Sequence, residues 1–403
     1  METILNLRSN ATTMNEVALS PFNPKLEVGD VIIYDSTLRD GEQTPGVTFN
    51  LEQKVAIARK LDEMGVPEIE AGFPAVSERE RASVRAICDE GLDAKILVLS
   101  RITKEDIDAS VDAGVDMVLL FIGTSDLHIK HKFKKDRRYV LDKIINGVEY
   151  AKDRGVKVSL SAEDTTRTDL DYLLSVYMVA EAAGADRVGV TDTLGCASPE
   201  AIAFLVARAK EVVRVPVSLH LHNDYGLALA NAIAGVKAGA DAVTTTVNGI
   251  GERCGNVPLE QFVAAMKFMY GKDLGIDTTK LKELSDMVEA FSGLAKPVNQ
   301  PLVGRNAFAH ESGIHVAAVL ACPLTYESID PRLVGNERHI LMGKHSGLNY
   351  IKKRVDDIGL IATDEQLAEI LGRVKDIGER KGRVNDLEFR EIVASVIRPV
   401  LIT

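Results

Sequence analysis

A repeating unit recurs along most of the chain from residue 31 onward. Each unit combines an amphipathic stretch, a glycine or short turn, and a run rich in β-branched residues that ends in polar or charged residues. The strand-like runs are VIIYDST, VPEIEAG, AKILVLS, DMVLLFIGTS, KVSLSAED, DRVGVTDT, PVSLHLHND and AVTTTVNGIGE. Strict alternation of strands and helices predicts a parallel sheet.

Helical stretches separate these runs, and glycines such as Gly65, Gly114 and Gly239 follow several of them as stop signals. We expect helices at about 51–64, 77–90, 103–113, 138–154, 169–183, 198–213, 226–238 and 259–270. Eight units close a barrel, whereas an open doubly wound sheet usually has about five or six strands and begins with a GxGxxG turn. The sequence lacks that turn at its first strand. We therefore predict an α/β fold, a (β/α)8 TIM barrel, with its chemistry where the strands end.

The length of the chain predicts more than the barrel. A (β/α)8 barrel needs roughly 250 residues, and this chain has 403. The first residues carry no clear period, and the repeat is lost after about residue 273, where other helical patterns begin. We expect an N-terminal arm at 1–28, a catalytic barrel domain at 29–273 and a mostly helical C-terminal region at 274–403.

Charge and composition exclude several classes of partner. The formal net charge of -11 argues against nucleic acids and anionic membranes, which require clustered Lys and Arg. No run approaches the ~18 apolar residues of a membrane span, and the polar N-terminus lacks the apolar core of a signal peptide. Four cysteines without CxxC spacing are expected to be reduced thiols. We expect a cytoplasmic protein with small-molecule partners.

The seventh strand, Val217 to Asp224, carries two histidines on one face. Because side chains alternate along a strand, His220 and His222 point into the barrel while the leucines face the helices. Imidazoles at positions i and i+2 can bind one cation from a rigid strand. A pair of hydrogen-bonded core histidines is the alternative, although burying two imidazoles merely to fill space is costly.

The loop after the first strand, YDSTLRDGEQ, is dense in charge. Asp40 in this loop would complete a His, His, Asp set that leaves positions open for water or substrate, as a catalytic metal needs. Arg39 could donate to a substrate carboxylate or to a developing oxyanion. A solvated turn with an ion pair would also explain these residues.

Three other strand ends add candidates. After the eighth strand, TTTVNGIGERCGN offers the Asn256 amide oxygen as a fourth ligand, although its glycines could instead form a phosphate cradle. Glu163 closes the fifth strand and could be a base, an orienting group or a neighbour of a helix cap at Asp164. Thr193 closes the sixth strand and should face the same barrel mouth.

Several motifs in order resemble the 2-isopropylmalate and homocitrate synthase family. They are TLRDGEQ, HLHND, NGIGERCGN, HESGIH and GKHSG, and the resemblance covers about residues 29 to 350. It implies a metal-dependent Claisen condensation of acetyl-CoA with a 2-oxo acid, followed by hydrolysis that releases CoA. It also implies a homodimer.

The resemblance assigns the metal ligands. Asp40, His220 and His222 match those of the family, and Asn256 matches a weaker or water-mediated ligand. The divalent cation would be Mg, Mn or Zn.

The resemblance also assigns substrate contacts. Arg39 matches the arginine beside the keto group and Thr193 matches a carboxylate contact, while Gln43 is a third predicted substrate-binding residue.

Proton transfer is assigned to the C-terminal region of the partner subunit. In similar enzymes a histidine and a tyrosine from that region complete the site, which here indicates His315 and Tyr326, with Glu163 nearby. HESGIH holds two histidines, so His310 is a rival to His315 for the base.

The chain looks most like archaeal homocitrate synthases that extend 2-oxoglutarate. The resemblance rests on its short length and on the segments SPFNPKLEVGD and HESGIHVAAVLACPLTYE. The additional C-terminal regulatory domain of larger isopropylmalate and citramalate synthases is not expected. Homocitrate synthases of the fungal type have a histidine after the third strand that meets the distal carboxylate, whereas SRITKED offers Thr103. The alternatives are an isopropylmalate or citramalate synthase and, more remotely, a C–C lyase of this barrel type or a non-catalytic metal-binding protein.

Overall fold

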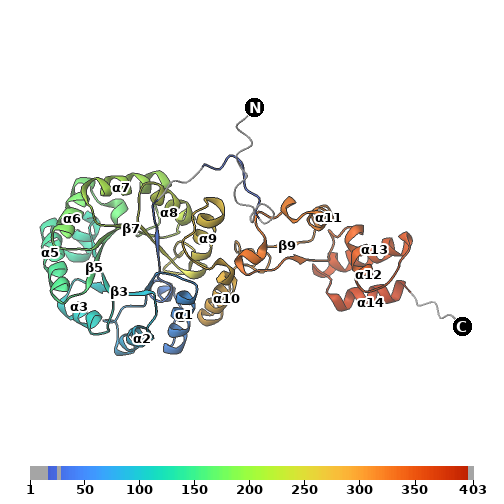
Figure 1. Cartoon of the computed structure of the whole chain (residues 1–403), viewed down its shortest axis with the longest axis horizontal. Helices are drawn as coiled ribbons and strands as arrows, with labels where there is room; N and C mark the ends of the chain where they lie inside the picture. The colour runs from blue at the N-terminus through green and yellow to red at the C-terminus, as the bar shows by residue number, and fades with distance from the viewer. Residues whose placement is uncertain (1–16, 25–28, 398–403) are drawn as a thin grey trace. The chain divides into compact units, whose positions relative to one another are not determined.

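Eight parallel strands form a closed barrel that is ringed by helices (Figure 1). The computed structural model describes residues 17–24 and 29–397. The strands follow one another around the barrel in chain order, and β1 pairs with β8 to close it. They are β1 (Ile32–Asp35), β2 (Glu68–Glu70), β3 (Lys95–Arg101), β4 (Met117–Gly123), β5 (Lys157–Glu163), β6 (Arg187–Asp192), β7 (Val217–Leu221) and β8 (Ala242–Thr245). The predicted TIM barrel is confirmed.

Helices connect the strands and cover the outside of the barrel (Figure 1). They are α1 (Leu51–Glu63), α2 (Glu78–Cys88), α3 (Lys104–Val111), α4 (Asp126–His128), α5 (Arg137–Asp153), α6 (Leu170–Ala182), α7 (Pro199–Val212), α8 (Ala228–Lys237), α9 (Leu259–Ala264) and α10 (Leu281–Ser292). The short α4 and the π-helix η2 (Ile129–Phe133) that follows it were not predicted. They lie in the connection between β4 and α5.

Local signals in the sequence explain where the helices begin and end. Asn50 caps α1 by accepting a hydrogen bond from the Gln53 N–H, and the Gln53 side chain accepts one from the Asn50 N–H. After α1, Gly65 adopts a φ of +86°, and a Cβ there would come within 2.6 Å of the Gly275 carbonyl oxygen. Glycine is therefore required by both the backbone conformation and the close approach of the two segments.

The barrel strands are buried on both faces, which explains why they read as apolar runs. All six residues of β6 are buried. Inside the barrel, a small apolar cluster of Tyr34, Leu97, Met117, Leu119 and Ala242 fills the space between opposite strands. The cluster leaves the carboxyl ends of the strands free for polar side chains.

An ion pair crosses the interior of the barrel from β6 to β2. Both nitrogens Nη1 and Nη2 of Arg187 donate to the Glu68 carboxylate at 2.8 Å, and both side chains are almost fully buried. Because each residue is the first of its strand, the pair lies at the amino ends of the strands, away from the strand ends where the candidate site residues lie.

A second compact unit comprises, among the described residues, 17–23 and 297–397, and the barrel unit runs from Pro24 to Lys296. The second unit contains α11 (Gly313–Ala321), α12 (Leu348–Asp357), α13 (Asp364–Lys381), α14 (Asp386–Val396) and the two short parallel strands β9 (Ala309–His310) and β10 (His339–Ile340). Helices α12, α13 and α14 share an apolar core that includes Ile351, Ile370 and Phe389. The expected helical C-terminal region is confirmed, whereas the functional division at residue 273 stays a prediction.

Among the described residues, no helix has the length and hydrophobicity needed to cross a membrane. The predicted cytoplasmic location stays a prediction. Most of the predicted arm at 1–28 lies outside the described residues.

The ion pair across the barrel provides a test of how the interior is stabilised. Arg187→Leu should lower the free energy of unfolding by about 3 kcal/mol, because it leaves the Glu68 carboxylate buried without its partner. Urea denaturation followed by circular dichroism measures the loss. The double variant Arg187→Leu with Glu68→Leu should recover most of it, and a single variant as stable as the wild type would contradict the role of the pair.

Candidate metal centre and substrate cavity

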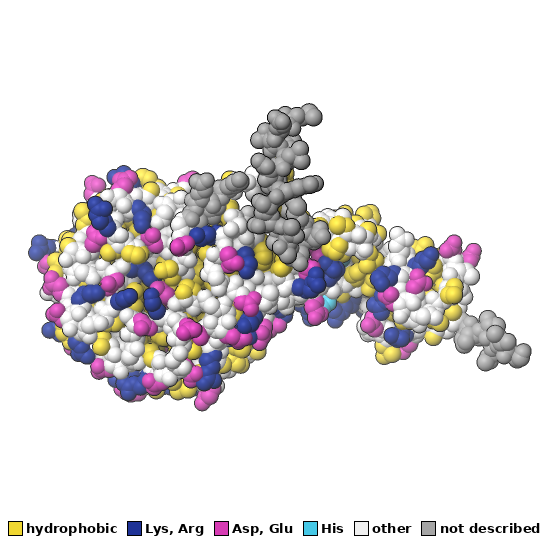
Figure 2. All heavy atoms as spheres, viewed as in Figure 1, with side chains coloured by type: hydrophobic (Ala, Val, Ile, Leu, Met, Phe, Trp, Pro, Cys, Tyr) yellow, Lys and Arg dark blue, Asp and Glu magenta, His cyan; other side chains and the backbone are white. Residues whose placement is uncertain are grey.

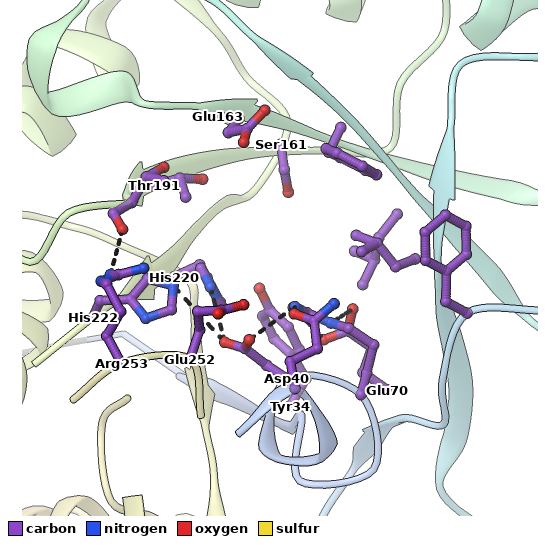
Figure 3. A pocket seen from close by; sticks show the side chains of 17 residues that line it. Tyr34, Asp40, Glu70, Ser161, Glu163, Thr191, His220, His222, Glu252 and Arg253 are labelled. Atoms are coloured by element: carbon purple, nitrogen blue, oxygen red, sulfur yellow. Dashed lines mark hydrogen bonds and ion pairs between the residues drawn. The ribbon is translucent and has the colours of Figure 1, made fainter. Parts of the chain in front are cut away.

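A cavity of about 380 Å³ opens where the barrel strands end. Figure 3 shows polar side chains converging on it from several strands. The lining residues are Tyr34, Arg39, Asp40, Gln43, Glu70, Phe73, Leu99, Leu119, Phe121, Ser161, Glu163, Thr191, Thr193, His220, His222, Glu252 and Arg253. The predicted residues of the first, fifth, sixth and seventh strands are thus brought together.

Asp40, His220 and His222 form a compact cluster on one side of the cavity (Figure 3). One potential ligand atom from each lies within 4.8 Å of the others. The Asp40 Oδ2 atom is 3.4 Å from His220 Nε2 and 3.9 Å from His222 Nε2. Two imidazole nitrogens and a carboxylate oxygen that face a common point are a donor set suited to Zn or Mn, and they leave coordination positions open.

The local fold explains how these three residues meet. His220 and His222 occupy alternate positions at the end of β7, and their rings lie 5.0 Å apart at an angle of 84°. Asp40 lies in the turn after β1, where its backbone N–H donates to the Ser36 hydroxyl. Only β8 separates β7 from β1 in the closed barrel, so residues 180 positions apart in the chain become neighbours.

Burial and neighbouring charges set the protonation states that a cation requires. Burial lowers the pKa of His220 to about 3, and it also lowers the pKa of His222. Burial alone would raise the pKa of Asp40, but the positive charge of Arg39 and the two histidines lower it below the usual value. At neutral pH the cluster therefore presents two neutral imidazoles and one carboxylate, the forms that bind metal.

Asn256 completes the cluster from the loop after β8. Its backbone forms an isolated bridge with His222, and its side chain N–H donates to the Ile250 carbonyl oxygen at 3.3 Å. Within the described structure, Asn256 Oδ1 and Asp40 Oδ2 are buried oxygens without a hydrogen-bond partner. A bound cation would satisfy both atoms, so the residues fit a divalent ion.

The glycines beside Asn256 have a structural explanation. Gly255 has a φ of +82°, and a Cβ there would overlap the Gly249 carbonyl oxygen, while a Cβ at Gly251 would overlap the Asn256 side chain. The loop can fold tightly and direct Asn256 inward only because these positions lack a side chain. This packing accounts for the glycines without a phosphate ligand.

Arg39 is held in place by a carboxylate that the sequence analysis missed. Its Nε and Nη2 atoms donate to Glu70 at 2.7 and 3.0 Å, and Glu70 also accepts a hydrogen bond from the Ser36 hydroxyl. Arg39 Nη1 lies 3.3 Å from Asp40 Oδ1 and donates to Gln43 Oε1 at 3.4 Å. Glu70 closes β2, so its position at a strand end was the signal that could have identified it.

Glu163 lies on the opposite side of the cavity from Asp40 (Figure 3). Its Oε2 atom is 2.6 Å from Lys132 Nζ and 3.7 Å from His128 Nδ1. His128 and Lys132 come from α4 and η2, the two short helices that were not predicted. Their cationic and imidazole groups make Glu163 part of a charged cluster at the barrel rim.

Thr193 is fixed from both sides. Its hydroxyl oxygen accepts a hydrogen bond from the Asp164 N–H at 2.7 Å, and its carbonyl oxygen accepts one from Arg253 at 2.7 Å. Arg253 also donates to both oxygens of Asp224, at 2.9 and 3.0 Å. The Thr193 hydroxyl hydrogen remains available for a ligand. Arg253 was not predicted as a site residue, although the motif NGIGERCGN that contains it was recognised.

The three candidates beyond the barrel belong to the second unit. The ring of His315 on α11 stacks on Tyr326 with centroids 4.0 Å apart and an angle of 28°. His310 Nε2 lies 3.1 Å from the buried Glu327 carboxylate, which also accepts two hydrogen bonds from Arg338 at 2.6 Å. His315 and Tyr326 are both exposed, whereas His310 is half-buried in this ion-pair network.

Comparison with known protein families identifies both parts of the chain. Residues 30–288 match the HMGL-like family, and residues 302–382 match the family described as homocitrate synthase post-HMGL domain-like. The chain belongs to the HMGL-like family. The second match is to the type of region that follows the barrel in homocitrate synthases, and it agrees with the unit that begins at Pro297.

Curated relatives narrow the family further. The homocitrate synthase AksA of Methanothermobacter thermautotrophicus is 50% identical over 385 residues, which cover 95% of this chain and 98% of the relative. AksA of Methanopyrus kandleri is 52% identical and covers 91% of this chain and 93% of the relative. The 2-isopropylmalate synthase of Methanocaldococcus jannaschii is 46% identical, with 91% and 72% coverage. This HMGL-like chain is therefore an acyl-CoA-dependent transferase, and the predicted homocitrate and isopropylmalate synthase family is confirmed.

Solved structures of more distant proteins support the fold. The HMG-CoA lyase of Bacillus subtilis superimposes with a TM-score of 0.62 at 17% identity, covering 70% of this chain and 98% of the lyase. An HMG-CoA lyase from Brucella melitensis gives a TM-score of 0.58 at 20% identity, with 66% and 99% coverage. At this identity the likeness shows the barrel and no shared activity.

The metal centre can be tested by direct binding. His222→Ala should weaken Mn²⁺ or Zn²⁺ binding by at least about 100-fold, because it removes one of three protein ligands from a small donor set. Calorimetry on protein stripped with a chelator measures the affinity, and circular dichroism checks the fold. His339→Ala, which removes an exposed histidine outside the barrel, is the matched control. Equal affinity in the folded His222→Ala protein and the wild type would exclude this centre.

Proposed function

We propose that the chain condenses acetyl-CoA with a 2-oxo dicarboxylic acid and releases CoA by hydrolysis of the thioester. With 2-oxoglutarate the product is homocitrate, and longer homologues of the same acid are further substrates. The proposal includes a divalent cation, Mg, Mn or Zn, at Asp40, His220 and His222, with Asn256 as the weaker ligand. It also includes a homodimer in which the C-terminal region of one subunit contributes to the barrel of the other.

One observation carries this proposal more than any other. A cluster of two neutral imidazoles and a carboxylate opens onto a cavity in a chain that is about half identical, over nearly its full length, to curated homocitrate synthases. The identity supports the reaction type, and the cluster supplies the electrophilic group that such a condensation needs. A non-catalytic metal-binding protein would leave Arg39 beside the cluster and Glu163 across the cavity unexplained.

Bound at this centre, a divalent cation would act as a Lewis acid on the keto group of the 2-oxo acid. Arg39 stabilises the negative charge that develops on that oxygen, because its guanidinium is held beside Asp40 and retains an Nη2 N–H that neither Glu70 contact uses. Burial alone would lower the pKa of Arg39, but the Glu70 carboxylate raises it, so the side chain stays charged. Thr193 donates its hydroxyl hydrogen to the substrate carboxylate, and Gln43 adds a polar contact at the rim.

Proton transfer is assigned to the second unit of the partner subunit. His315 takes a proton from the methyl group of acetyl-CoA at an imidazole nitrogen, and Tyr326 returns a proton to the product. The stacking of the two rings supports a joint role, whereas His310 has its Nε2 engaged by Glu327. Glu163 orients the base or the thioester from the barrel side.

An isopropylmalate or citramalate synthase is the second candidate. Leu99, Leu119 and Phe121 give the cavity an apolar wall, which suits a 2-oxo acid with an apolar side chain. The 46% identity to a 2-isopropylmalate synthase is almost as high as that to the homocitrate synthases. The choice of 2-oxo acid therefore needs an activity measurement.

A substrate panel decides between the two candidates. The protein is incubated with acetyl-CoA and 2-oxoglutarate, 2-oxoadipate, 2-oxoisovalerate or pyruvate, and free thiol release is followed with and without EDTA. We expect the highest kcat/KM with a dicarboxylic 2-oxo acid and loss of turnover in the chelator. Preference for 2-oxoisovalerate or pyruvate would refute the homocitrate assignment, and turnover indifferent to EDTA would refute the role of the metal.

The composite site is tested by mixing two inactive variants. His222→Ala disables the barrel centre and His315→Ala disables the proposed base, so each homodimer should be inactive. If the base acts across the dimer, hybrids with one intact site should restore about a quarter of wild-type turnover after subunit exchange. His310→Ala should keep substantial activity by itself. No recovery in verified hybrids would place both residues in the same subunit's site or remove His315 from the mechanism.

A further inference from the structure

A second cavity, of about 280 Å³, lies beside the substrate cavity and has no role in the mechanism above. We call it the side pocket. Arg101, Thr103, Lys132, Tyr139 and Lys143 contribute to its walls. Phe121 and Glu163 line both cavities, so the two adjoin each other at these side chains.

The side pocket is positively charged in a protein whose net charge is -11. Three cations and one carboxylate line it. Arg101 is paired with Asp106 at 2.6 Å and Lys132 with Glu163 at 2.6 Å. Lys143 is half-buried, and in the described part of the chain its ammonium group contacts the Tyr139 ring and has no carboxylate within ion-pair distance. The pocket therefore has a positive charge available for an anion.

The three cations come from separate elements, which distinguishes the pocket from a solvated basic loop. Arg101 ends β3, Lys132 lies in η2 and Lys143 lies within α5. Aromatic faces support two of them, since Lys132 lies 5.8 Å from the Phe121 ring centre and Lys143 5.9 Å from that of Tyr139. Convergence of cations and aromatic rings on one cavity is typical of recognition sites for anionic groups.

The loop that forms one side of the pocket has an unusual backbone. Segment 130–138, KHKFKKDRR, contains six Lys and Arg residues. The π-helix η2 ends at Phe133 and is followed by its C-cap Lys134, whose φ is +54°. π-Helices and left-handed non-glycine residues occur preferentially at functional sites. Figure 2 shows Lys and Arg side chains among carboxylates over the middle of the barrel unit, consistent with an anionic substrate on this face.

Among the described residues that line the substrate cavity, no Lys or Arg is left without a carboxylate partner to hold a second anionic group. Its two arginines, Arg39 and Arg253, each make two hydrogen bonds to one carboxylate, Glu70 and Asp224. A substrate with a second anionic end must therefore find its counter-charge elsewhere. The side pocket is adjacent and supplies one.

We propose that the side pocket binds the second, anionic end of a substrate whose reacting end lies in the substrate cavity. This inference rests on the proposed condensation. Two substrates have such an end: the distal carboxylate of a 2-oxo dicarboxylic acid and the phosphates of acetyl-CoA. Lys143 is the residue whose substitution tests the proposal, because among the described residues no carboxylate neutralises its charge.

Lys143→Gln tests the pocket, and Lys130→Gln, which changes an exposed lysine of η2, is the matched control. KM is measured for acetyl-CoA and for the N-acetylcysteamine thioester, which lacks the phosphates. It is also measured for 2-oxoadipate and for 2-oxohexanoate, which lacks the distal carboxylate. Losing one charge-assisted contact should raise one KM by about tenfold. Lys143→Arg, which keeps the charge, should stay near the wild type.

The pattern of KM values identifies the source of the anion. A rise for acetyl-CoA but not for the cysteamine thioester assigns the pocket to the phosphates. A rise for 2-oxoadipate but not for 2-oxohexanoate assigns it to the distal carboxylate. Unchanged KM values for all four substrates in a folded Lys143→Gln protein would overturn the proposal.

Binding measurements separate this inference from the proposed function. Calorimetry with coenzyme A and with 2-oxoadipate requires no turnover and is repeated on Lys143→Gln. Wild-type protein that binds either compound through Lys143 but never condenses them would refute the condensation and retain the pocket. Protein that condenses the two compounds but binds both equally tightly after Lys143→Gln would retain the condensation and refute the pocket.

Discussion

The pairing of β1 with β8 is the constraint on which the candidate site depends. Closure brings the loop after β1 next to the ends of β7 and β8, so that Asp40 clusters with the two histidines and Asn256 lies beside His222. All eight strands run parallel, so their carboxyl ends lie on the same side. Alternation along each strand then decides which side chains enter the barrel. An open sheet with the same strands would leave Asp40 far from His220.

Charges in the barrel are paired with partners from other strands and connecting segments. Glu70 holds Arg39, Glu68 holds Arg187 from across the interior, and Lys132 faces Glu163 at the rim. Pairing offsets the cost of removing these charges from water. Asp40 Oδ2 and Asn256 Oδ1 are among the buried oxygens of the described residues that lack a hydrogen-bond partner, and both lie beside the two histidines. The combination of unsatisfied oxygens with two neutral imidazoles is what marks this cluster as a candidate metal centre.

Substrate choice depends on parts of the barrel that differ from the chemistry common to the family. In the proposed reaction the candidate metal centre and Arg39 contact the 2-oxo acid end, and this arrangement fits a homocitrate synthase and an isopropylmalate synthase equally well. Leu99, Leu119 and Phe121 form an apolar wall, whereas Arg101, Lys132 and Lys143 bring positive charge to the adjoining pocket. The balance between the wall and the charges is therefore where selection among 2-oxo acids can occur.

By itself, the sequence determined the barrel, because eight strand and helix periods are local patterns of hydrophobicity and turn residues. It also predicted the cluster of Asp40, His220 and His222, since alternation on β7 and the strand-end rule are local geometry, and the order of the motifs predicted the family. Only the tertiary structure revealed Glu70 as the partner of Arg39, the Arg187–Glu68 pair, and the side pocket formed by β3, η2 and α5. Each of these features depends on contacts between residues far apart in the chain. Packing sets the distances between such residues and decides which charges are paired, and no local sequence pattern records either.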